Sequence, residues 1–447
     1  MQKKLLIVLS VMIILTGLLV LACKYNLGPG NLDFSNLKKK GGLADGLIGY
    51  NGEITYGKGT AIVPKLSEAI EVFPFQSASS YYRIPSLVVT TKGTLLAFAD
   101  KRYNNRDDLP NRIEVEVKRS TDSGKTWSKP IRITPSSSSK NDGYGDTATV
   151  LIRENNTVLA FVASHVGFRA STPSNPIRIN LFKSSDDGLT WQGPEDITPQ
   201  VYGAQCKDAL RKGWHAAFVS SGNGIQLSTG RILVVMNVRE DSQWNVRLFR
   251  NYVLYSDDGG TTWSVSKNAP VNSVGGNEAK IVELADGRLL MTARPSSGNK
   301  RMHAYSSDRG ETWTTAEPKS DITVAGSNGD MIYYTSIKNG WDTNRIIHFI
   351  PTATTTVSGE GQYNGRTGPA NPYFYYSYDD GKTFSKGPQL QNKQAGYSSL
   401  AVLHDGSIGV LFEDKSWGGP IKFMRMNFEW VTRGKDKGPE KKTVKNN

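Results

Sequence analysis

An eight-residue pattern, Ser-x-Asp-x-Gly-x-Thr-Trp, occurs five times in this chain of 447 residues and constrains its fold more than any other feature. The copies begin at Ser120, Ser184, Ser256, Ser306 and Ser377, and the last copy has Phe384 where the others have Trp. Self-similarity at such intervals is typical of a repeat architecture, in which each repeat is one supersecondary unit.

Each copy follows an apolar or aromatic segment that is typical of a strand, such as "IRINLFK" before the second and "PYFYY" before the fifth. An Asp side chain can accept hydrogen bonds from its own turn, and the Gly two residues later can adopt a left-handed backbone. The Trp then opens the next strand and can cover the turn from the side. Each copy therefore predicts the corner of a β-hairpin.

Repeated hairpins with almost no long helical periodicity favour an all-β fold, a β-propeller, whose radial repetition protects the sheet edges. Five corners require at least five blades. A sixth, unmarked blade is expected over residues 385–430, where "AVLHDGSIGVLFED" and "IKFMRMNFEW" are typical of further strands. The N-terminal stretch is expected to complete that blade.

The N-terminus has a different character from the rest of the chain. Lys3 and Lys4 precede an apolar run over residues 5–22, which is typical of a secretory signal. The run ends in "VLAC", which is similar to a bacterial lipobox, so Cys23 is the expected lipidation site. Ordinary cleavage and an uncleaved membrane anchor are the alternatives, and all three place the protein outside the cytoplasm. The expected organisation is a signal peptide over 1–23, a linker and lead-in over 24–74, a propeller over 75–430 and a basic tail over 431–447.

The formal net charge of +13 lies mostly at the two ends, in residues 1–40 and 433–447. The long middle is close to neutral, which argues against nucleic acid as a partner, and the ends are interpreted as solvated tails. Cys206 is the only cysteine besides Cys23. Once Cys23 is lipidated or removed, this excludes an intrachain disulfide, and the same count excludes a cysteine metal site. The five His are scattered without metal-ligand spacing, so neither a metal nor a cofactor is expected.

The five copies resemble the Asp-boxes of the sialidase (neuraminidase) superfamily, whose members are six-bladed propellers with the boxes on the periphery, away from the catalytic face. Other secreted propellers carry such boxes, so the site residues must separate an enzyme from a binding propeller. "YRIP", residues 82–85, is similar to the motif that opens sialidase catalytic domains. The resemblance makes Arg83 the first of three arginines that clamp the sialic acid carboxylate, for which a planar guanidinium is well suited.

Two further segments carry the resemblance to the other arginines. "NEAKIVELADGRLLMTAR" is similar to the family segment with a Glu near its start and the second arginine at its end, which implies Glu278 and Arg294. The third arginine is placed at Arg366 in "NGRTGPANPYFYYS", and Arg345 in "TNRIIHFI" is the alternative.

The remaining site residues are implied in the same way. "QAGYSSLAVLHDGSIGVLFED" resembles the segment with the nucleophilic Tyr, here Tyr397, and Glu413 after it matches the acid that steadies the first arginine. "ADKRYNNRDDLPNRIEV" supplies the general acid, Asp108 with Asp107 as the alternative. It also supplies Arg102, which resembles a residue that contacts the sugar hydroxyls. Asp146 in "GYGDTATV" is in the position of an acidic substrate contact.

A tyrosine nucleophile has a physical reason in this family, which is an exception to the paired carboxylates of most glycosidases. The anomeric carbon of sialic acid carries a carboxylate, so a second anion would approach it against Coulomb repulsion. A neutral phenol approaches without that penalty. Since free Tyr has a pKa of about 10, it needs a base within hydrogen-bond reach. Glu278 is the candidate for that base.

The resemblance covers residues 75–430 and implies a retaining exo-α-sialidase. Such an enzyme removes terminal sialic acid from glycoproteins, glycolipids or oligosaccharides without a cofactor. A trans-sialidase or an intramolecular trans-sialidase would have the same site and is the main alternative. A sialic-acid-binding propeller without turnover is the other, but binding alone would need only the arginines, and the catalytic set is intact.

Overall fold

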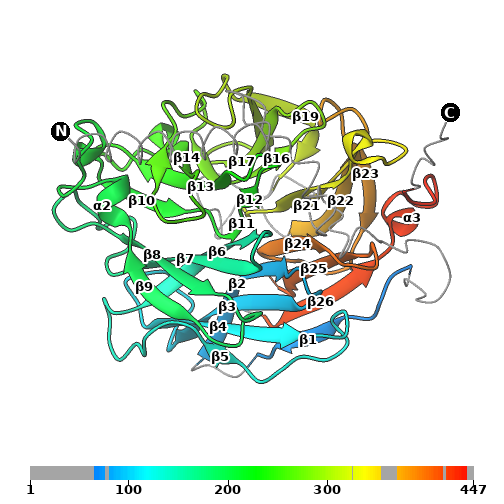
Figure 1. The fold of residues 1–447 in the computed structure, drawn as a ribbon, viewed down its shortest axis with the longest axis horizontal. Coiled ribbons are helices and arrows are strands. Elements are labelled where there is room, and N and C mark those ends of the chain that lie inside the picture. The colour runs from blue at the N-terminus through cyan, green and yellow to red at the C-terminus, as the bar shows by residue number, and fades with distance from the viewer. Residues whose placement is uncertain (1–64, 76–79, 325, 354–369, 416–418, 440–447) are drawn as a thin grey trace, which may run out of the picture.

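Six antiparallel sheets surround a common centre and form the blades of a β-propeller (Figure 1). The structure is a computed structural model that describes residues 65–75, 80–324, 326–353, 370–415 and 419–439. Successive blades contact one another around the whole ring: β2 contacts β6, β6 contacts β10, β13 of the third blade contacts β16, and β16, β20, β24 and β2 follow in turn. The six-bladed all-β fold predicted from the repeats is confirmed.

In the first five blades the four main strands run from the centre outward in chain order, and the sixth blade differs only in its outermost strand. The first blade has β2 (Ser80–Val89), β3 (Leu95–Tyr103), β4 (Ile113–Ser120) and β5 (Ile131–Arg132). The second has β6 (Tyr144–Ile152), β7 (Thr157–Ser164), β8 (Arg178–Ser184) and β9 (Gln192–Asp196), with β11 (Gly222–Asn223) added in parallel to β6. The third has β10 (Ala216–Val219), β13 (Ile232–Arg239), β14 (Arg250–Ser256) and β15 (Ser264–Val265), with β12 (Ile225–Gln226) beside β13.

The last three blades have four strands each. The fourth has β16 (Gly276–Glu283), β17 (Leu289–Pro295), β18 (Lys300–Ser306) and β19 (Glu317–Thr323). The fifth has β20 (Asp330–Thr335), β21 (Arg345–Ala353), β22 (Ala370–Ser377) and β23 (Ser385–Gln389). The sixth has β24 (Ser398–Val402), β25 (Ile408–Glu413), β26 (Ile421–Met426) and, outermost, β1 (Ile70–Phe73).

The sixth blade is closed by a strand from the other end of the chain. β1 pairs antiparallel with β26 through Ile70 and Phe423, and an isolated bridge joins Leu66 to Met426. The N-terminal stretch therefore completes this blade, as the sequence predicts. The propeller itself begins before residue 75, inside the range expected to be a lead-in.

The apolar core is divided into six layers, one between each pair of neighbouring blades. The layer between the first and second blades, for example, joins Phe98 of β3 to Val158 of β7. Because a blade is apolar on both faces, its middle strands contain long buried runs, such as the eight consecutive buried residues of β13. The two faces of each blade thus contribute to two different layers.

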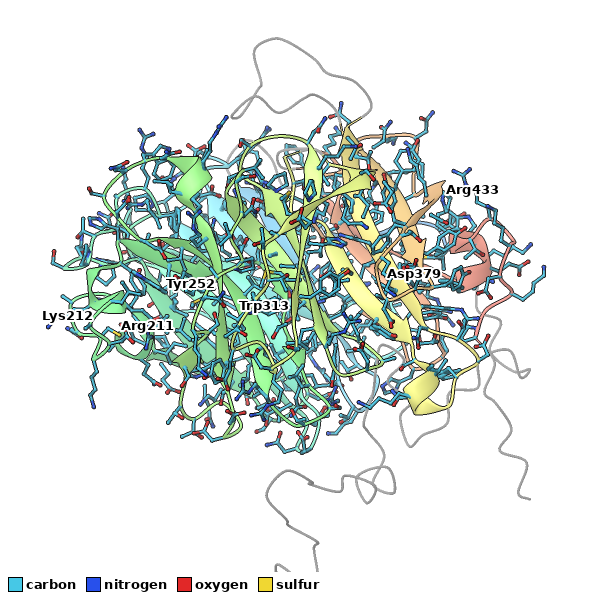
Figure 2. All side chains as sticks on the ribbon, turned by 90° about the horizontal axis from the view of Figure 1, so that it is seen from above. Arg211, Lys212, Tyr252, Trp313, Asp379 and Arg433 are labelled. Carbon is cyan, nitrogen blue, oxygen red and sulfur yellow. The ribbon has the colours of Figure 1, made fainter. Side chains whose placement is uncertain are left out.

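The five repeated boxes lie where the third strand of a blade turns into the fourth. β4, β8, β14, β18 and β22 each end at the Ser that opens a box. In the fourth box, Asp308 accepts hydrogen bonds from the Thr312 backbone N–H (2.9 Å) and hydroxyl (2.6 Å). Figure 2 turns the molecule by 90° and labels Trp313 and Asp379, members of two successive boxes, on the edge of the ring.

Each box also touches the preceding blade. Gly381 of the fifth box has φ +78°, and a Cβ placed on it would lie 2.4 Å from Leu290 of β17 in the fourth blade. The box aromatics enter the same layers: Trp313 packs between the third and fourth blades, and Phe384 between the fourth and fifth. The boxes therefore fasten blades together as well as closing hairpins.

The layer between the fifth and sixth blades contains no box. After β26 the chain forms α3 (Phe428–Val431), and the Phe428 ring stacks on Tyr334 with 5.1 Å between centroids. The other short helical segments are α2 (Thr198–Val201) and the 3₁₀ turns Arg211–Gly213, Val246–Leu248 and Ile337–Asn339. No helix in the described ranges has the length and apolar character needed to span a membrane.

Candidate active site

One face of the ring collects the functional side chains predicted from the sequence. In each blade the first strand begins and the antiparallel second strand ends on the same face. Arg83, Asp146 and Glu278 lie near the starts of β2, β6 and β16, while Arg294 and Glu413 lie near the ends of β17 and β25. Side chains from the first, second, fourth and sixth blades can therefore meet on this face.

Register shifts in the inner strands β2, β6 and β16 change the direction of several of these side chains. The register shifts between Arg83 and Ser86, between Gly145 and Ala148, and between Gly276 and Ala279. Two residues in these stretches have positive φ, Ile84 at 57° and Asp146 at 57°. An extra residue bends a strand locally and re-aims its side chains, and such bulges are common beside active sites.

The centre of the site is a three-residue contact between Tyr397, Glu278 and Arg294. The Tyr397 hydroxyl donates a short hydrogen bond to Glu278 Oε1 and accepts one from Arg294 Nη1 at 2.8 Å. The same Nη1 lies 3.0 Å and 2.7 Å from the two Glu278 oxygens. Glu278 and Arg294 are 6% and 7% exposed, so the carboxylate is almost removed from water yet paired with a cation. A carboxylate in this position can accept the phenolic proton.

In the protein without substrate, the surroundings of Tyr397 keep its phenol protonated. Burial raises the pKa of Tyr397 well above 10, and the negative charge of Glu278 raises it further, while Arg294 and Arg83 act in the opposite direction. The hydroxyl is therefore a neutral group with a proton acceptor already in contact. Its proton would leave only as the oxygen forms a new bond.

Glu413 links the first arginine to the tyrosine. This fully buried carboxylate lies 3.3 Å from Arg83 Nε and accepts the Ile84 backbone N–H at 3.0 Å through Oε1. Its Oε2 accepts the Tyr397 backbone N–H at 3.2 Å. The Arg83 guanidinium lies 5.5 Å from the centre of the Tyr397 ring. The structure thus brings Arg83, Glu413 and Tyr397 together.

A second group of charges surrounds Arg102, whose side chain is completely buried. Its Nη1 lies 2.6 Å from Asp108 Oδ1, and its Nη2 lies 3.0 Å from Asp100 Oδ2. Asp108 Oδ1 is also 3.8 Å from Arg83 Nη1, and the Asp108 side chain is 68% exposed. Asp100 in turn accepts the backbone N–H of Asp146 at 3.1 Å. Asp108 is therefore an accessible carboxyl held between two arginines.

These carboxyls have different proton affinities. Desolvation alone would raise the pKa of Asp108, but the charges of Arg102 and Arg83 outweigh it and hold that pKa below its ordinary value. Burial raises the pKa of Asp100 to about 6 against the opposing charge of Arg102. Burial and the nearby Asp108 and Asp100 charges raise the pKa of Asp146 well above its ordinary range.

Asp107 and Asp108, the two residues that the sequence offers as the general acid, have different surroundings. Asp107, the alternative general acid, is exposed, and its backbone N–H bonds to Asn105, whereas Asp108 contacts both arginines. Arg366 lies outside the described residues, as does Cys23. The strands that flank residue 366 close at the pair Ala353–Ala370, between β21 and β22.

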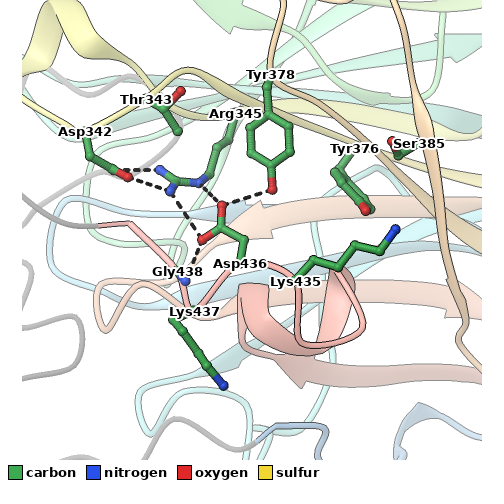
Figure 3. Close-up of a pocket in the computed structure, with 10 residues that line it drawn as sticks. All are labelled: Asp342, Thr343, Arg345, Tyr376, Tyr378, Ser385, Lys435, Asp436, Lys437 and Gly438. Atoms are coloured by element: carbon green, nitrogen blue, oxygen red, sulfur yellow. Dashed lines mark hydrogen bonds and ion pairs between the residues drawn. The ribbon is translucent and has the colours of Figure 1, made fainter.

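Arg345, the alternative third arginine, lies at the opposite end of its strand from the site. It opens β21, and its guanidinium binds Asp342 at 2.7 Å and Asp436 at 2.9 Å (Figure 3). Tyr378 donates a hydrogen bond to the same Asp436 at 3.0 Å. These residues line a cavity of about 650 Å³ between the fifth blade and the C-terminal segment. The structure therefore gives Arg345 a role in holding residues 435–438 against the blade.

Several buried polar residues near the site were not predicted. Asp100 lies two residues before Arg102 on the same face of β3, and this period-two spacing was the available signal. Arg301, Asn328 and Lys280 are at most 1% exposed, and their partners lie far away in sequence, so no local pattern marks them. Within the described ranges, no three His, Cys, Asp or Glu side chains are arranged to hold a metal ion.

Comparison with known proteins agrees with this fold. A family profile described as "BNR repeat-like domain" matches residues 84–412. The chain is 30% identical over 354 residues to a sialidase of Bacteroides fragilis, covering 75% of this chain and 60% of that protein. It is also 30% identical over 369 residues to a sialidase of Micromonospora viridifaciens, covering 78% of this chain and 52% of that protein. Among solved structures, the Hadza microbial sialidase Hz136 superimposes with a TM-score of 0.69 at 24% identity, covering 81% of this chain and 69% of that one.

The fold, the boxes and these matches define a propeller of the BNR repeat-like class. The chain belongs to the sialidase superfamily. It spans between half and two thirds of the length of the two bacterial relatives.

Proposed function

We propose that this chain is a retaining exo-α-sialidase that hydrolyses terminal sialic acid from glycoproteins, glycolipids and oligosaccharides. The observation that carries the proposal is the contact of the Tyr397 hydroxyl with both Glu278 and Arg294. Binding of an acidic sugar would need the arginines alone. A half-buried phenol that touches a buried carboxylate is the arrangement required for a nucleophile with its base.

Arg83, Arg294 and Arg366 are the proposed partners of the sialic acid carboxylate. Support comes from the positions of Arg83 and Arg294 on either side of Tyr397. Arg294 Nη1 is already bound to Glu278 and Tyr397, so this guanidinium is held in place beside the phenol. Arg366 is assigned from its sequence segment. Two or three guanidinium groups around one carboxylate would fix the orientation of the sugar ring.

The proposed reaction proceeds by two displacements. The Tyr397 oxygen attacks the anomeric carbon as its proton passes to Glu278, and Asp108 donates a proton to the departing glycosidic oxygen. In the second step the Asp108 carboxylate takes a proton from water, which attacks the same carbon. Tyr397 then leaves and recovers its proton from Glu278. Two inversions at one carbon retain the configuration.

Arg102 and Asp146 are proposed as substrate contacts on the side of the acid. Arg102 is covered by Asp100 and Asp108, so its first role in this arrangement is to hold Asp108 in place. Asp146 is partly exposed beside them. Its raised pKa favours a neutral carboxyl, which can donate as well as accept hydrogen bonds to sugar hydroxyls.

Substitution of the nucleophile tests the proposal. Tyr397→Phe removes only the hydroxyl, so the fold should persist while release of a fluorogenic sialoside falls by several orders of magnitude. Tyr334→Phe is a control of the same chemical change, because the Tyr334 hydroxyl bonds to the Gly406 carbonyl, away from the site. Turnover by Tyr397→Phe at the wild-type rate would contradict the nucleophile assignment.

Product analysis by NMR separates hydrolysis from its alternatives. The α-anomer of free sialic acid should appear first and then mutarotate, as retention requires. Transfer to added lactose would instead identify a trans-sialidase, and an anhydro-sugar would identify intramolecular transfer. Binding of sialosides without any product would identify a non-catalytic propeller.

We also propose that the chain is exported and tethered to a membrane through a lipid on Cys23. The support is the sequence of residues 1–23. Metabolic labelling with an alkyne fatty acid should label the wild-type protein and leave Cys23→Ser unlabelled. Release of Cys23→Ser into the soluble fraction would accompany loss of the label, and equal labelling of both proteins would contradict the assignment.

A further inference from the structure

The strand that begins beside Tyr397 is held by side chains of the neighbouring blade. β24 and β20 are inner strands of different sheets and share no backbone ladder. Asn328 bridges the gap: its Oδ1 accepts the Ser398 backbone N–H at 3.1 Å, and its Nδ2 donates to the Ser398 carbonyl at 3.4 Å. Asp330 continues the link by accepting the Leu400 N–H at 2.7 Å.

Asn328 is itself rigidly held. Its side chain is completely buried, and Oδ1 also accepts the Gly329 N–H at 2.6 Å. Its backbone carbonyl accepts a hydrogen bond from Arg301 Nη1. Arg301 is fully buried as well, and its Nε donates to Thr292 Oγ1 at 3.0 Å. Within the described residues no carboxylate pairs with this guanidinium, so its hydrogen bonds go to neutral oxygens around Asn328.

The two sides of the Tyr397 backbone are therefore fixed by different residues. On one side Glu413 accepts the Tyr397 N–H at 3.2 Å, and its own N–H donates to the Tyr397 carbonyl at 2.9 Å. On the other side Asn328 grips the next residue, Ser398. Together these contacts restrain the backbone on both sides of Tyr397 and hence the direction of its Cα–Cβ bond. The phenol depends on that direction to reach Glu278.

We propose that Asn328 is a positioning residue for the Tyr397 hydroxyl, with Arg301 as its anchor. The inference rests on the proposed sialidase function, in which that hydroxyl attacks the substrate. Asn328 touches no reacting atom in this scheme and acts through the Ser398 peptide. Since a reacting atom misplaced by about 1 Å can slow a reaction on the order of 10²-fold, its loss should affect turnover more than binding.

The test compares two asparagines that grip a backbone in the same way. Asn268 accepts the Trp313 N–H at 2.8 Å and donates to the Trp313 carbonyl at 3.0 Å, but it lies at a box on the rim. Asn328→Ala should lower kcat by roughly 10- to 100-fold and leave KM within about a factor of two, because the arginines are untouched. Asn268→Ala should lower the melting temperature and leave kcat unchanged. Equal kcat in Asn328→Ala, Asn268→Ala and wild type would overturn the proposal.

A second variant covers the case in which Asn328→Ala does not fold. Asn328→Asp keeps the acceptor for the Ser398 N–H and loses the donor to the Ser398 carbonyl. Loss of that donor should let the Ser398 peptide and the Tyr397 phenol shift, so kcat should fall by roughly 10-fold. A folded Asn328→Asp with the wild-type kcat would overturn the proposal.

The proposed function and the positioning role fail in different ways. If wild type releases no sialic acid from any sialoside, the proposed function fails. The positioning role is then decided by crystal structures of wild type and whichever Asn328 variant folds. A Tyr397 hydroxyl that moves away from Glu278 in the variant supports the role, and an unmoved hydroxyl overturns it.

Discussion

At the scale of single residues, the surroundings of the Tyr397 hydroxyl and the Asp108 carboxyl shift their pKa values in opposite directions. Tyr397 touches a buried carboxylate and keeps its proton, whereas Asp108 touches Arg102 and Arg83 and readily loses its proton. Yet the proposed first step needs Asp108 to be protonated. The substrate carboxylate resolves this conflict, because it would neutralise part of the charge of Arg83 and so raise the pKa of Asp108 in the complex.

This difference predicts separate pH profiles for the free and the substrate-bound protein. The profile of kcat/KM reports the free protein and that of kcat reports the complex. Both should fall as pH rises through the pKa of Asp108. The fall in kcat should lie at higher pH than the fall in kcat/KM, because binding raises that pKa. If kcat and kcat/KM, measured from pH 3 to 8, fell at the same pH, this electrostatic coupling would be contradicted.

His303 provides a test of pH-dependent stability. It is 2% exposed, neither ring nitrogen has a hydrogen-bond partner among the described residues, and its ring contacts Phe384 at 5.6 Å. Burial lowers the pKa of His303 well below 6.5. The unfolded chain therefore binds more protons than the folded one below pH 6.5, and stability falls as pH falls, by up to about 1.4 kcal/mol per pH unit.

Replacement of this ring should remove its share of the acid sensitivity. His303→Leu loses no hydrogen bond, so its stability near pH 7.5 should stay within about 1.5 kcal/mol of wild type. Denaturant unfolding at pH 7.5, 6.5 and 5.0 should show a smaller loss of stability in the variant than in wild type. Parallel losses in the two proteins would show that His303 does not cause the sensitivity.

At the scale of elements, the boxes make blade contacts that depend on a residue without a Cβ. Gly381→Ala places a methyl group 2.4 Å from Leu290 Cδ2 and keeps φ at +78°. Gly230 also has positive φ, +90°, but a Cβ there meets no atom within 4 Å. The pair separates the cost of the backbone conformation from the cost of crowding between blades.

We expect Gly230→Ala to destabilise the protein by about 1–2 kcal/mol through the left-handed conformation alone. Gly381→Ala should cost a further 1–3 kcal/mol or so through overpacking against Leu290. Both variants should keep wild-type kcat per folded molecule, because both lie away from the site. Equal stability losses in denaturant unfolding would show that the box does not press on the preceding blade.

The elements also show what the sequence could and could not predict. The boxes were predictable because each is a local turn, in which Asp308 and Thr312 are four residues apart. Glu278 and Arg294 could be named because both lie in one segment, residues 277–294, that resembles the sialidase family. Asn328 was not, because its partner Ser398 lies 70 residues away and the intervening segment has no pattern that sets their approach. Such contacts depend on how neighbouring blades pack against each other.

Other residues show the same limit at the site itself. Spacing favoured Asp108 but left Asp107 as an alternative. In the structure Asp108 is the one that contacts Arg102 and Arg83. Arg345 has the same residue type as the third arginine of the family, yet its strand points it toward Asp342 and Asp436. Residue type alone does not report which end of a strand a side chain occupies.

At the scale of the whole molecule, the ring has one junction without a box. α3 supplies Phe428 to the layer between the fifth and sixth blades, and its side chain is completely buried. Phe428→Ala should lower the free energy of unfolding by about 3–5 kcal/mol, while Phe428→Leu should cost clearly less because it leaves a smaller cavity. Thermal and denaturant unfolding would measure both. A negligible effect of Phe428→Ala would show that this junction does not rely on α3.

The pairing of β1 with β26 has a consequence for synthesis of the chain. Ile70 is made long before Phe423, so the ring cannot close on the ribosome until β26 has been made. A chain that stops short of β26 would keep two unpaired strand edges, on β1 and on β25, and such edges invite aggregation and proteolysis. Proteases and chaperones that recognise exposed strand edges would therefore act on copies without β26 and spare copies in which the ring has closed.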